Sequence, residues 1–387
     1  MAEFKVRKGV LEIPEGVETI ESSHLKRLKR FVVSVKIPSS VKTIGNGAFE
    51  DCNKLQCIEI PESVTEIYDS TFSRCYSLQS VHIPESVKEI GGHAFVDCTS
   101  LQNINIPDSV TEIGDSAFEG CTSLQNIHIQ ESVTKIGDAA FAKCTSLQNI
   151  EIPDSVKEIG DSAFEGCTSL QNIHIPDSVK KIGGCAFTDC TSLQNIYLPN
   201  SITEIETWAF GACKSLQSIE IPDSVTYIGN KTFYYCKSLQ TFHIPESVTE
   251  IGDSAFEGCT SLQNIHIPDS VKGIDWEAFT GCTSLRNIHI PDSITYIGSG
   301  TFSGCTSLQT INIPNSITYI DSKTFYYCTS LQSIHIPESV TEIGLNTFSN
   351  CTNLKTVHLP NLIKAEWKYA FDDCKNLAED FFDLFNK

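Results

Sequence analysis

The sequence lacks any long apolar run. No segment approaches the ~20 consecutive apolar residues that a membrane-spanning helix requires. The first residues, MAEFKVRKGVLEIPEG, contain no apolar stretch of the kind that a signal peptide carries. These absences predict a chain without membrane insertion and without a classical export signal, and so, on sequence alone, a cytoplasmic one.

Positive charge is also scarce. The chain has 28 Lys and Arg residues against 48 Asp and Glu, a formal net charge of -20. Such a surface repels the phosphates of nucleic acid, which excludes a nucleic-acid partner. One basic cluster stands near the N-terminus, at Lys26, Arg27, Lys29 and Arg30. It is interpreted as a solvated face, with a site for an anionic partner as the alternative.

Motifs that carry chemistry are missing too. The sequence has no nucleophile elbow, phosphate-binding loop, HExxH or EF-hand. Nearly every Ser, Asp, Glu and His is a copy within a repeat, whereas a catalytic site is an arrangement that occurs once. Fifteen of the 17 cysteines recur in steps of 23 residues, from Cys52 to Cys374, and none has the CxxC spacing of a zinc site. We therefore expect no enzyme, no cofactor and no metal site, with the cysteines as buried free thiols.

What is present is a unit of 23 residues, marked by prolines from Pro38 to Pro360. The stretch Leu170-Gln-Asn-Ile-His-Ile175 alternates apolar and polar residues, which predicts a strand with one buried face. Pro176 ends it, and Val179 to Ile182 predict a second short extended segment. The residues from 161 to 166 favour a single helical turn around Phe164.

Identical units stack with equivalent residues one strand spacing apart. A phenylalanine recurs every 23 residues from Phe49 to Phe371, and a leucine from Leu55 to Leu377. These ladders predict one solenoid of about 15 coils of 23 residues. We expect a cap and irregular first repeat at residues 1–36, repeats at 37–374, and a capping amphipathic helix at 375–387. Both ends have the character of natural caps, so we expect a complete protein.

The stretch IPDSVTEIGDSAFEGCTSLQNIHIP resembles the BspA-like leucine-rich repeats, because I-x-I-P, I-G-x-x-A-F and C-x-x-L recur together at fixed spacing. The resemblance covers about residues 37–377. It implies a curved leucine-rich-repeat solenoid, rich in β-structure, with a parallel sheet on the concave side and short helical turns. Family members are mostly surface or secreted proteins that bind matrix proteins or other cells. Adhesion and a cell-surface or secreted location are therefore implied, although this chain has no visible export signal or anchor.

Aromatic residues that do not repeat are the best candidates for a binding surface, because copying the core cannot explain them. They are Trp208, Tyr227, Tyr234, Tyr235, Trp276, Tyr296, Tyr319, Tyr326 and Tyr327. The alternative is that they are ordinary scattered surface residues.

Histidine recurs between the two isoleucines of the predicted strand. His243, His266 and His289 are consecutive there, which suggests stacked rings that bind a partner, bind a metal or sense pH. The alternative is a solvated surface row that the repeat copies.

The sequence thus favours a non-enzymatic scaffold that binds a protein or a glycan over an extended face. The alternative is a structural protein whose uniform surface mediates self-association.

Overall fold

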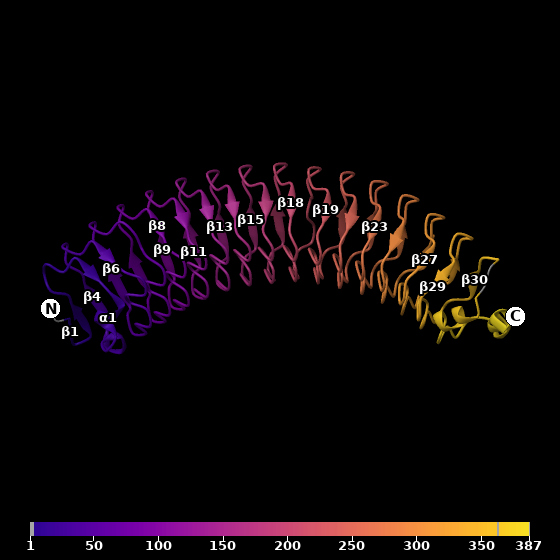
Figure 1. Cartoon of the computed structure of the whole chain (residues 1–387), viewed down its shortest axis with the longest axis horizontal. Coiled ribbons are helices and arrows are strands. Elements are labelled where there is room, and N and C mark those ends of the chain that lie inside the picture. Colours follow the sequence, from indigo (N-terminus) through magenta and orange to yellow (C-terminus); the bar gives the residue numbers. More distant parts are fainter. Residues whose placement is uncertain (1–3, 362–363, 387) are drawn as a thin grey trace. The chain divides into compact units, whose positions relative to one another are not determined.

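The structure is a computed structural model that describes residues 4–361 and 364–386. Its contacts divide the chain into two units, Met1–Ser201 (unit 1) and Ile202–Lys387 (unit 2). Each unit is a stack of coils, and the coils follow one another in chain order (Figure 1). Most coils contribute one strand to each of two rows, so the predicted parallel-sheet solenoid is confirmed.

The first strand row carries the three-residue strands and the two-residue β26. In unit 1 it consists of β1 (Lys5–Arg7), β2 (Val10–Glu12), β4 (Ser34–Lys36), β6 (Cys57–Glu59), β7 (Ser80–His82), β9 (Asn103–Asn105), β11 (Asn126–His128), β13 (Asn149–Glu151), β15 (Asn172–His174) and β17 (Asn195–Tyr197). In unit 2 it consists of β20 (Thr241–His243), β22 (Asn264–His266), β24 (Asn287–His289), β26 (Thr310–Ile311), β28 (Ser333–His335) and β30 (Thr356–His358).

The second strand row carries two-residue strands. In unit 1 these are β3 (Thr19–Ile20), β5 (Thr43–Ile44), β8 (Glu89–Ile90), β10 (Glu112–Ile113), β12 (Lys135–Ile136), β14 (Glu158–Ile159) and β16 (Lys181–Ile182). In unit 2 they are β18 (Glu204–Ile205), β19 (Tyr227–Ile228), β21 (Glu250–Ile251), β23 (Gly273–Ile274), β25 (Tyr296–Ile297), β27 (Tyr319–Ile320) and β29 (Glu342–Ile343).

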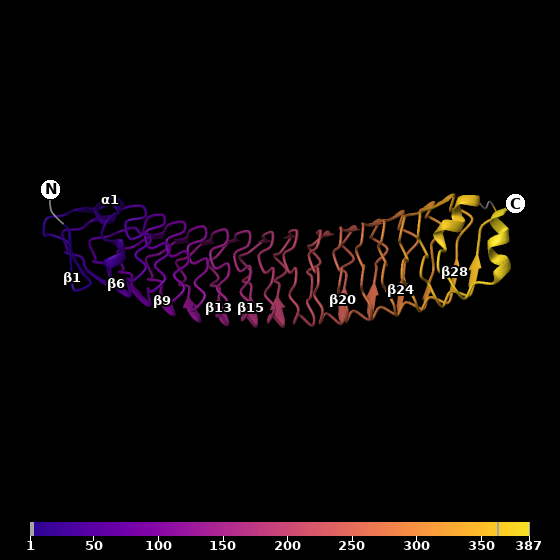
Figure 2. The ribbon, with the colours of Figure 1, turned by 90° about the horizontal axis from the view of Figure 1, so that it is seen from below.

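β1 pairs antiparallel with β2, and the pairs β2–β4 and β3–β5 join residues 24 positions apart. From β4 and β5 onward, pairing in both rows joins residues 23 positions apart. Ile127 of β11 pairs with Ile104 of β9 and Ile150 of β13, for example, and both pairs are parallel. Figure 2 shows β6, β9, β13 and β15 of unit 1 along one edge. In the three-residue strands from β6 to β28 the middle residue points into the core and its neighbours are exposed, as the period-two pattern predicts.

Phenylalanine stacking fills the interior between the rows. The ladder rings are fully buried, and neighbouring rings lie nearly parallel with centroids 5.2–5.6 Å apart from Phe49 to Phe187 in unit 1. In unit 2 the spacing is 5.1–5.7 Å from Phe210 to Phe371. No coil covers its own ring, so each one depends on its neighbours for burial.

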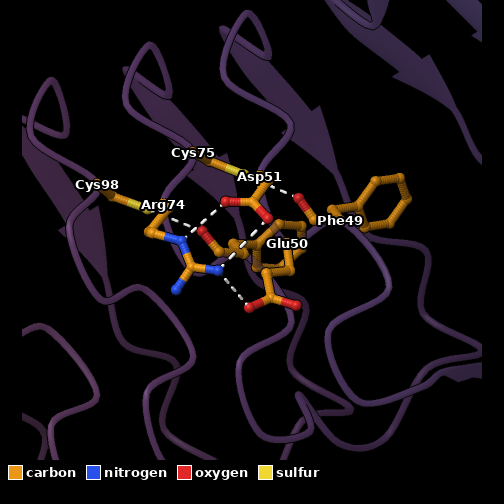
Figure 3. A network of polar contacts seen from close by, with 7 residues as sticks. Phe49, Glu50, Asp51, Arg74, Cys75 and Cys98 are labelled. Atoms are coloured by element: carbon orange, nitrogen blue, oxygen red, sulfur yellow. Dashed lines mark hydrogen bonds and ion pairs between the residues drawn. The ribbon is translucent and has the colours of Figure 1, made fainter. Parts of the chain in front are cut away.

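The ladder cysteines are free and buried, as expected. The ladder thiols from Cys75 to Cys190 and from Cys236 to Cys374 each donate to the carbonyl of the phenylalanine 26 residues earlier. Cys75 Sγ lies 3.2 Å from the oxygen of Phe49, and Cys98 Sγ lies 3.2 Å from that of Phe72. Figure 3 shows the first of these contacts beside the ion pair of Arg74. The thiols thus tie successive coils together without forming disulfides.

The segment predicted as a helical turn is a run of tight turns instead. Ser162 and Gly166 have φ of 55° and 69°, in the left-handed region, so no helix forms. This geometry turns alternate N–H groups outward to the next coil, where Phe164 N donates to Ala186 O at 2.9 Å and Ser162 N to Gly184 O at 2.7 Å. The two left-handed residues therefore lie two positions before and two positions after the ladder phenylalanine.

The two ends depart from the repeat. Near the N-terminus, α1 (Ser22–Leu25) and the 3-10 helix η1 (Lys29–Phe31) replace the usual turns, and Phe4 stacks on His24 at 4.7 Å. Near the C-terminus, η2 (Ala365–Ala370) and η3 (Glu379–Asn386) are 3-10 helices. Phe381 of η3 packs edge-on against Phe371, the last ladder ring, at 5.2 Å. The domain boundaries at residues 36 and 374 stay predictions.

Candidate functional site

The histidine row lies on the exposed side of the first strand row. His243, His266 and His289 are register partners on β20, β22 and β24, and all three side chains are exposed. Among the described residues, ring contacts in this row join His335 to His358 at 6.1 Å and His174 to Tyr197 at 5.2 Å, but none joins the consecutive trio. Nor do the described residues hold a group of three or more His, Cys, Asp or Glu arranged for a metal ion.

The unrepeated aromatic residues lie elsewhere in unit 2, on the second strand row and the turns that follow it. A first group surrounds Trp208, whose ring is 4.7 Å from that of Tyr234, which in turn is 4.5 Å from Tyr235. The ammonium group of Lys231 lies 5.2 Å from the Trp208 ring and 5.8 Å from the Tyr234 ring. Lys231 was not among the residues predicted from the sequence. Its cation–π contacts join the rings of Trp208 and Tyr234.

A second group consists of Tyr227 on β19, Trp276 just after β23, and Tyr296 on β25. The Tyr227 hydroxyl donates to Asn230 Oδ1 at 2.9 Å. Trp276 is 58% exposed and its ring edge lies over Gly298 in the next coil, where an added Cβ would be 2.5 Å from Trp276 Cδ1. Burial raises the pKa of Tyr296, and a hydrogen bond from the Trp276 side chain offsets part of that rise.

Tyr319, Tyr326 and Tyr327 extend the aromatic surface along unit 2. Tyr319 donates to Asp321 Oδ1 at 3.1 Å, and the rings of Tyr326 and Tyr327 are 4.7 Å apart and edge to face. Burial and the neighbouring charge of Asp321 raise the pKa of Tyr319. Asp321 thus places a negative charge beside Tyr319.

Several of these side chains occupy the left-handed backbone positions. Trp208, Tyr235 and Tyr327 have φ of 65°, 56° and 60°. Bulky residues are uncommon there, at a cost on the order of 1–2 kcal/mol each. The same two positions are left-handed in most coils, so this backbone conformation belongs to the repeat and does not by itself mark a functional site.

A hollow of about 480 Å³ lies among these groups. Its lining includes Tyr234, Trp276, Lys231, Asp253 and Glu257. It therefore brings residues of the Trp208 group and of the Trp276 group to one place, which the sequence did not predict. Tyr227, Tyr296 and Tyr319 lie on the neighbouring strands.

Acidic side chains beside the hollow give this surface a negative charge. Burial, together with the charges of Glu250 and Asp253, raises the pKa of Asp275 to about 6. Burial also raises the pKa of Tyr227, to which Asp275, Glu250 and Asp253 add. Most coils have glycine at the position of Asp275, for example Gly252 and Gly298. This departure from the repeat is visible in the sequence, but Asp275 was not among the predicted site residues.

A larger hollow of about 680 Å³ in unit 1 has a different origin. Its lining includes Asp138 and Asp161, which recur in the repeat. Asp138 Oδ1 accepts from the backbone N–H of Asp161 at 2.9 Å, and Asp161 Oδ1 accepts from that of Gly184 at 2.9 Å. These carboxylates therefore join neighbouring coils, which is a structural role.

Comparison with protein families identifies the repeat. The model described as "BspA type Leucine rich repeat region (6 copies)" matches residues 9–123, 88–185, 157–282 and 249–378. The chain belongs to the BspA-type leucine-rich repeat family. No curated protein sequence matches it.

Solved structures of other leucine-rich repeat proteins share the fold. A leucine-rich repeat protein from Bacteroides ovatus is 32% identical, with a TM-score of 0.74 and 97% of each chain covered. A leucine rich cell surface protein from Faecalibacterium prausnitzii is 31% identical, with a TM-score of 0.55 and 96% of each chain covered. A leucine-rich repeat protein from Eubacterium ventriosum is 26% identical, with a TM-score of 0.53 over 73% of this chain and 78% of that one. This BspA-type chain is thus a repeat scaffold.

Across residues 4–361 and 364–386, no helix is both long enough and apolar enough to cross a membrane.

Proposed function

We propose that this BspA-type protein is a non-enzymatic scaffold that binds a protein partner through the aromatic surface of unit 2. The aromatic surface comprises Trp208, Tyr227, Tyr234, Tyr235, Trp276, Tyr296, Tyr319, Tyr326 and Tyr327. The observation that carries the proposal is the exposure of Trp276, at 58%, beside a hollow in a molecule whose other large apolar side chains mostly stack inside. Tryptophan and tyrosine anchors at the edge of a pocket are typical of interface hot spots.

Relatives support the same role. The Faecalibacterium prausnitzii structure carries the name of a cell surface protein. By analogy, we propose that this chain is displayed on a cell surface and has an adhesion-like function. A protein partner is favoured over a glycan because the aromatic surface extends over successive coils from Trp208 to Tyr327. A protein–protein contact of standard size covers about 800 Å² on each side, which requires several coils.

Affinity capture with matched variants tests the proposal. The double variant Trp276→Ala with Tyr296→Ala removes two anchors, and we expect it to lose the partners that the wild-type protein retains. Removal of one hot-spot anchor weakens binding by about 2 kcal/mol, or roughly 30-fold.

The control is His266→Ala with His289→Ala, which truncates exposed rings on the other strand row. It is expected to retain every partner. Equal capture by the wild-type protein and the aromatic variant would show that the aromatic surface is not the binding site. Loss with the histidine variant instead would place binding on the first strand row.

A further inference from the structure

Two phenylalanines are exposed instead of stacking inside. The chain has 21 phenylalanines, and the exposed ones are Phe31 at 50% and Phe382 at 39%. The other rings are buried, except that of Phe4, which is half-buried and stacks on His24. Phe31 ends η1 in unit 1 and Phe382 lies in η3 in unit 2, so both belong to the segments that depart from the repeat. A phenyl ring has no polar tip for water to solvate, which makes these segments candidate contact surfaces.

Phe31 lies in a basic segment. Residues 22–49 contain six Lys or Arg residues and no Asp or Glu, in a chain whose net charge is -20. Lys26, Arg27 and Arg30 are exposed, and the Arg30 guanidinium lies 4.8 Å from the centre of the Phe31 ring. Among the described residues, no ion pair involves any of these three cations. Together they form the basic cap: Lys26, Arg27, Arg30 and Phe31.

Phe382 lies in a segment of the opposite charge. Residues 376–386 contain three acidic residues and no basic one. One side of η3 packs on the last ladder ring, whereas Phe382 and Leu384 are each 39% exposed. Asp380 and Asp383 are exposed as well, and no ion pair in the part of the chain that the structure describes involves them. These residues form the acidic cap: Asp380, Phe382, Asp383 and Leu384.

We propose that the basic cap of one copy of this protein binds the acidic cap of another copy. Phe31 packs against Phe382 and Leu384, and the surrounding cations face Asp380 and Asp383. Each cap offers an apolar centre with charges around it, which is the composition of an interface with an apolar core and a polar rim.

Charge complementarity argues for a second copy as the occupant. The net charge of -20 opposes contact between copies in general, whereas the pairing of the two caps brings opposite charges together. A sulfated polysaccharide would also suit the basic cap, but it would leave the exposed apolar residues of the acidic cap without a role. A contact between two different surfaces leaves one cap free on each copy, so further copies add head to tail.

The inference goes beyond the proposed function, because the caps and the aromatic surface share no residue. Copies joined through their caps keep their aromatic surfaces available. Several such surfaces in one assembly raise the avidity for a partner that carries repeated sites.

Sedimentation velocity over a range of protein concentrations, at low ionic strength, tests the inference. We expect the sedimentation coefficient of the wild-type protein to rise with concentration, and to rise less at high ionic strength, because salt screens exposed charges. Arg27→Glu with Arg30→Glu reverses the basic cap, and this variant should self-associate about tenfold more weakly or less still, because like charges then meet.

Asp380→Lys with Asp383→Lys reverses the acidic cap and should weaken self-association to a similar extent. This variant is less negative overall, which by itself would favour association. A loss of association therefore points to the caps and not to the net charge.

An equimolar mixture of the two reversed variants is the sharpest test. Each variant alone carries two caps of the same sign, whereas in the mixture a contact between unlike copies joins opposite charges. The mixture is therefore expected to regain the concentration dependence of the wild-type protein. Such recovery also shows that both variants are folded.

Lys88→Glu with Lys157→Glu is the matched control, since it reverses two exposed lysines in the coils of unit 1. It is expected to leave self-association close to that of the wild-type protein. Phe382→Ser removes the apolar contact without a change of charge, and it should weaken self-association about tenfold with little change in melting temperature.

A sedimentation coefficient of the wild-type protein that does not change with concentration would overturn the inference, and so would a mixture that stays monomeric. Equal loss with the lysine control would also overturn it, because net charge would then govern association. Binding of heparin by a wild-type protein that stays monomeric would assign the basic cap to a polyanion instead.

The Trp276→Ala, Tyr296→Ala variant separates this inference from the proposed function. It is expected to self-associate as the wild-type protein does. Loss of self-association in this variant would move the contact between copies to the aromatic surface and overturn the inference. Its behaviour in affinity capture decides the proposed function independently.

Discussion

Replacement of Asp275 by asparagine is expected to stabilise the protein at neutral pH and to remove part of its pH dependence. Burial and the charges of Glu250 and Asp253 raise the pKa of Asp275 from 3.8 to about 6. Between those values the native state holds a proton that the unfolded chain has released. Stability therefore rises as the pH falls from about 6 to about 4, and it is lowest above pH 6.

The size of the effect follows from the shift. Two pKa units correspond to about 3 kcal/mol. Asp275 is only partly buried, and solvent screening reduces this to about 1–1.5 kcal/mol. Asparagine has a similar shape and carries no charge at any pH. Asp275→Asn should exceed the wild-type protein in stability by that amount at pH 7.5, and the difference should vanish near pH 4.

Urea unfolding followed by circular dichroism at several pH values measures this difference. Asp269→Asn is the control, since it removes the same charge from an exposed turn of the same coil. Its effect should stay within about 0.5 kcal/mol at every pH. A gap between Asp275→Asn and the wild-type protein that is the same at pH 4 and pH 7.5, or a less stable variant at pH 7.5, would refute the reasoning.

Two further predictions concern the coils themselves. Ala212 has φ of 56°, so Ala212→Gly should raise the free energy of unfolding by about 0.5–1 kcal/mol in thermal melts. Ala209 is buried and its φ is not positive, so Ala209→Gly should lower the free energy of unfolding by about 1 kcal/mol or more. A loss with Ala212→Gly would contradict the strain argument. A thiol reagent should modify the exposed Cys57 rapidly and leave Cys259, whose pKa burial raises well above its usual range, unmodified until the protein unfolds. Rapid native-state modification of all 17 cysteines would show that the ladder opens.

The repeat made the core predictable and hid part of the site. Phe164 and its copies recur at one spacing, so their stacking followed from the sequence. The turn around Phe164 did not, because the sequence shows serine and glycine there, which suit both a helical turn and a left-handed backbone. Hydrogen bonds to the next coil decide between the two, and those bonds form only in the stack.

The candidate site was predictable where a side chain is conspicuous. Trp276 and Tyr296 stand out from the repeat by type, whereas Asp275 is a common residue at a place where most coils have glycine. Recognising Asp275 needs the structure, which partly buries it near Glu250 and Asp253. The grouping of Lys231 with Trp208 likewise depends on contacts between coils.

The left-handed backbone positions have a consequence for how such a protein changes over time. Their backbone groups bond to the next coil, so the fold fixes the main chain there and leaves the side chain unspecified. The second of these positions holds Arg74, Lys143, Tyr235 and Asn350 in different coils. One substitution per coil at such a place alters the displayed surface without altering the stack. The solenoid therefore separates the residues that maintain its structure from those on which selection for a new partner can act.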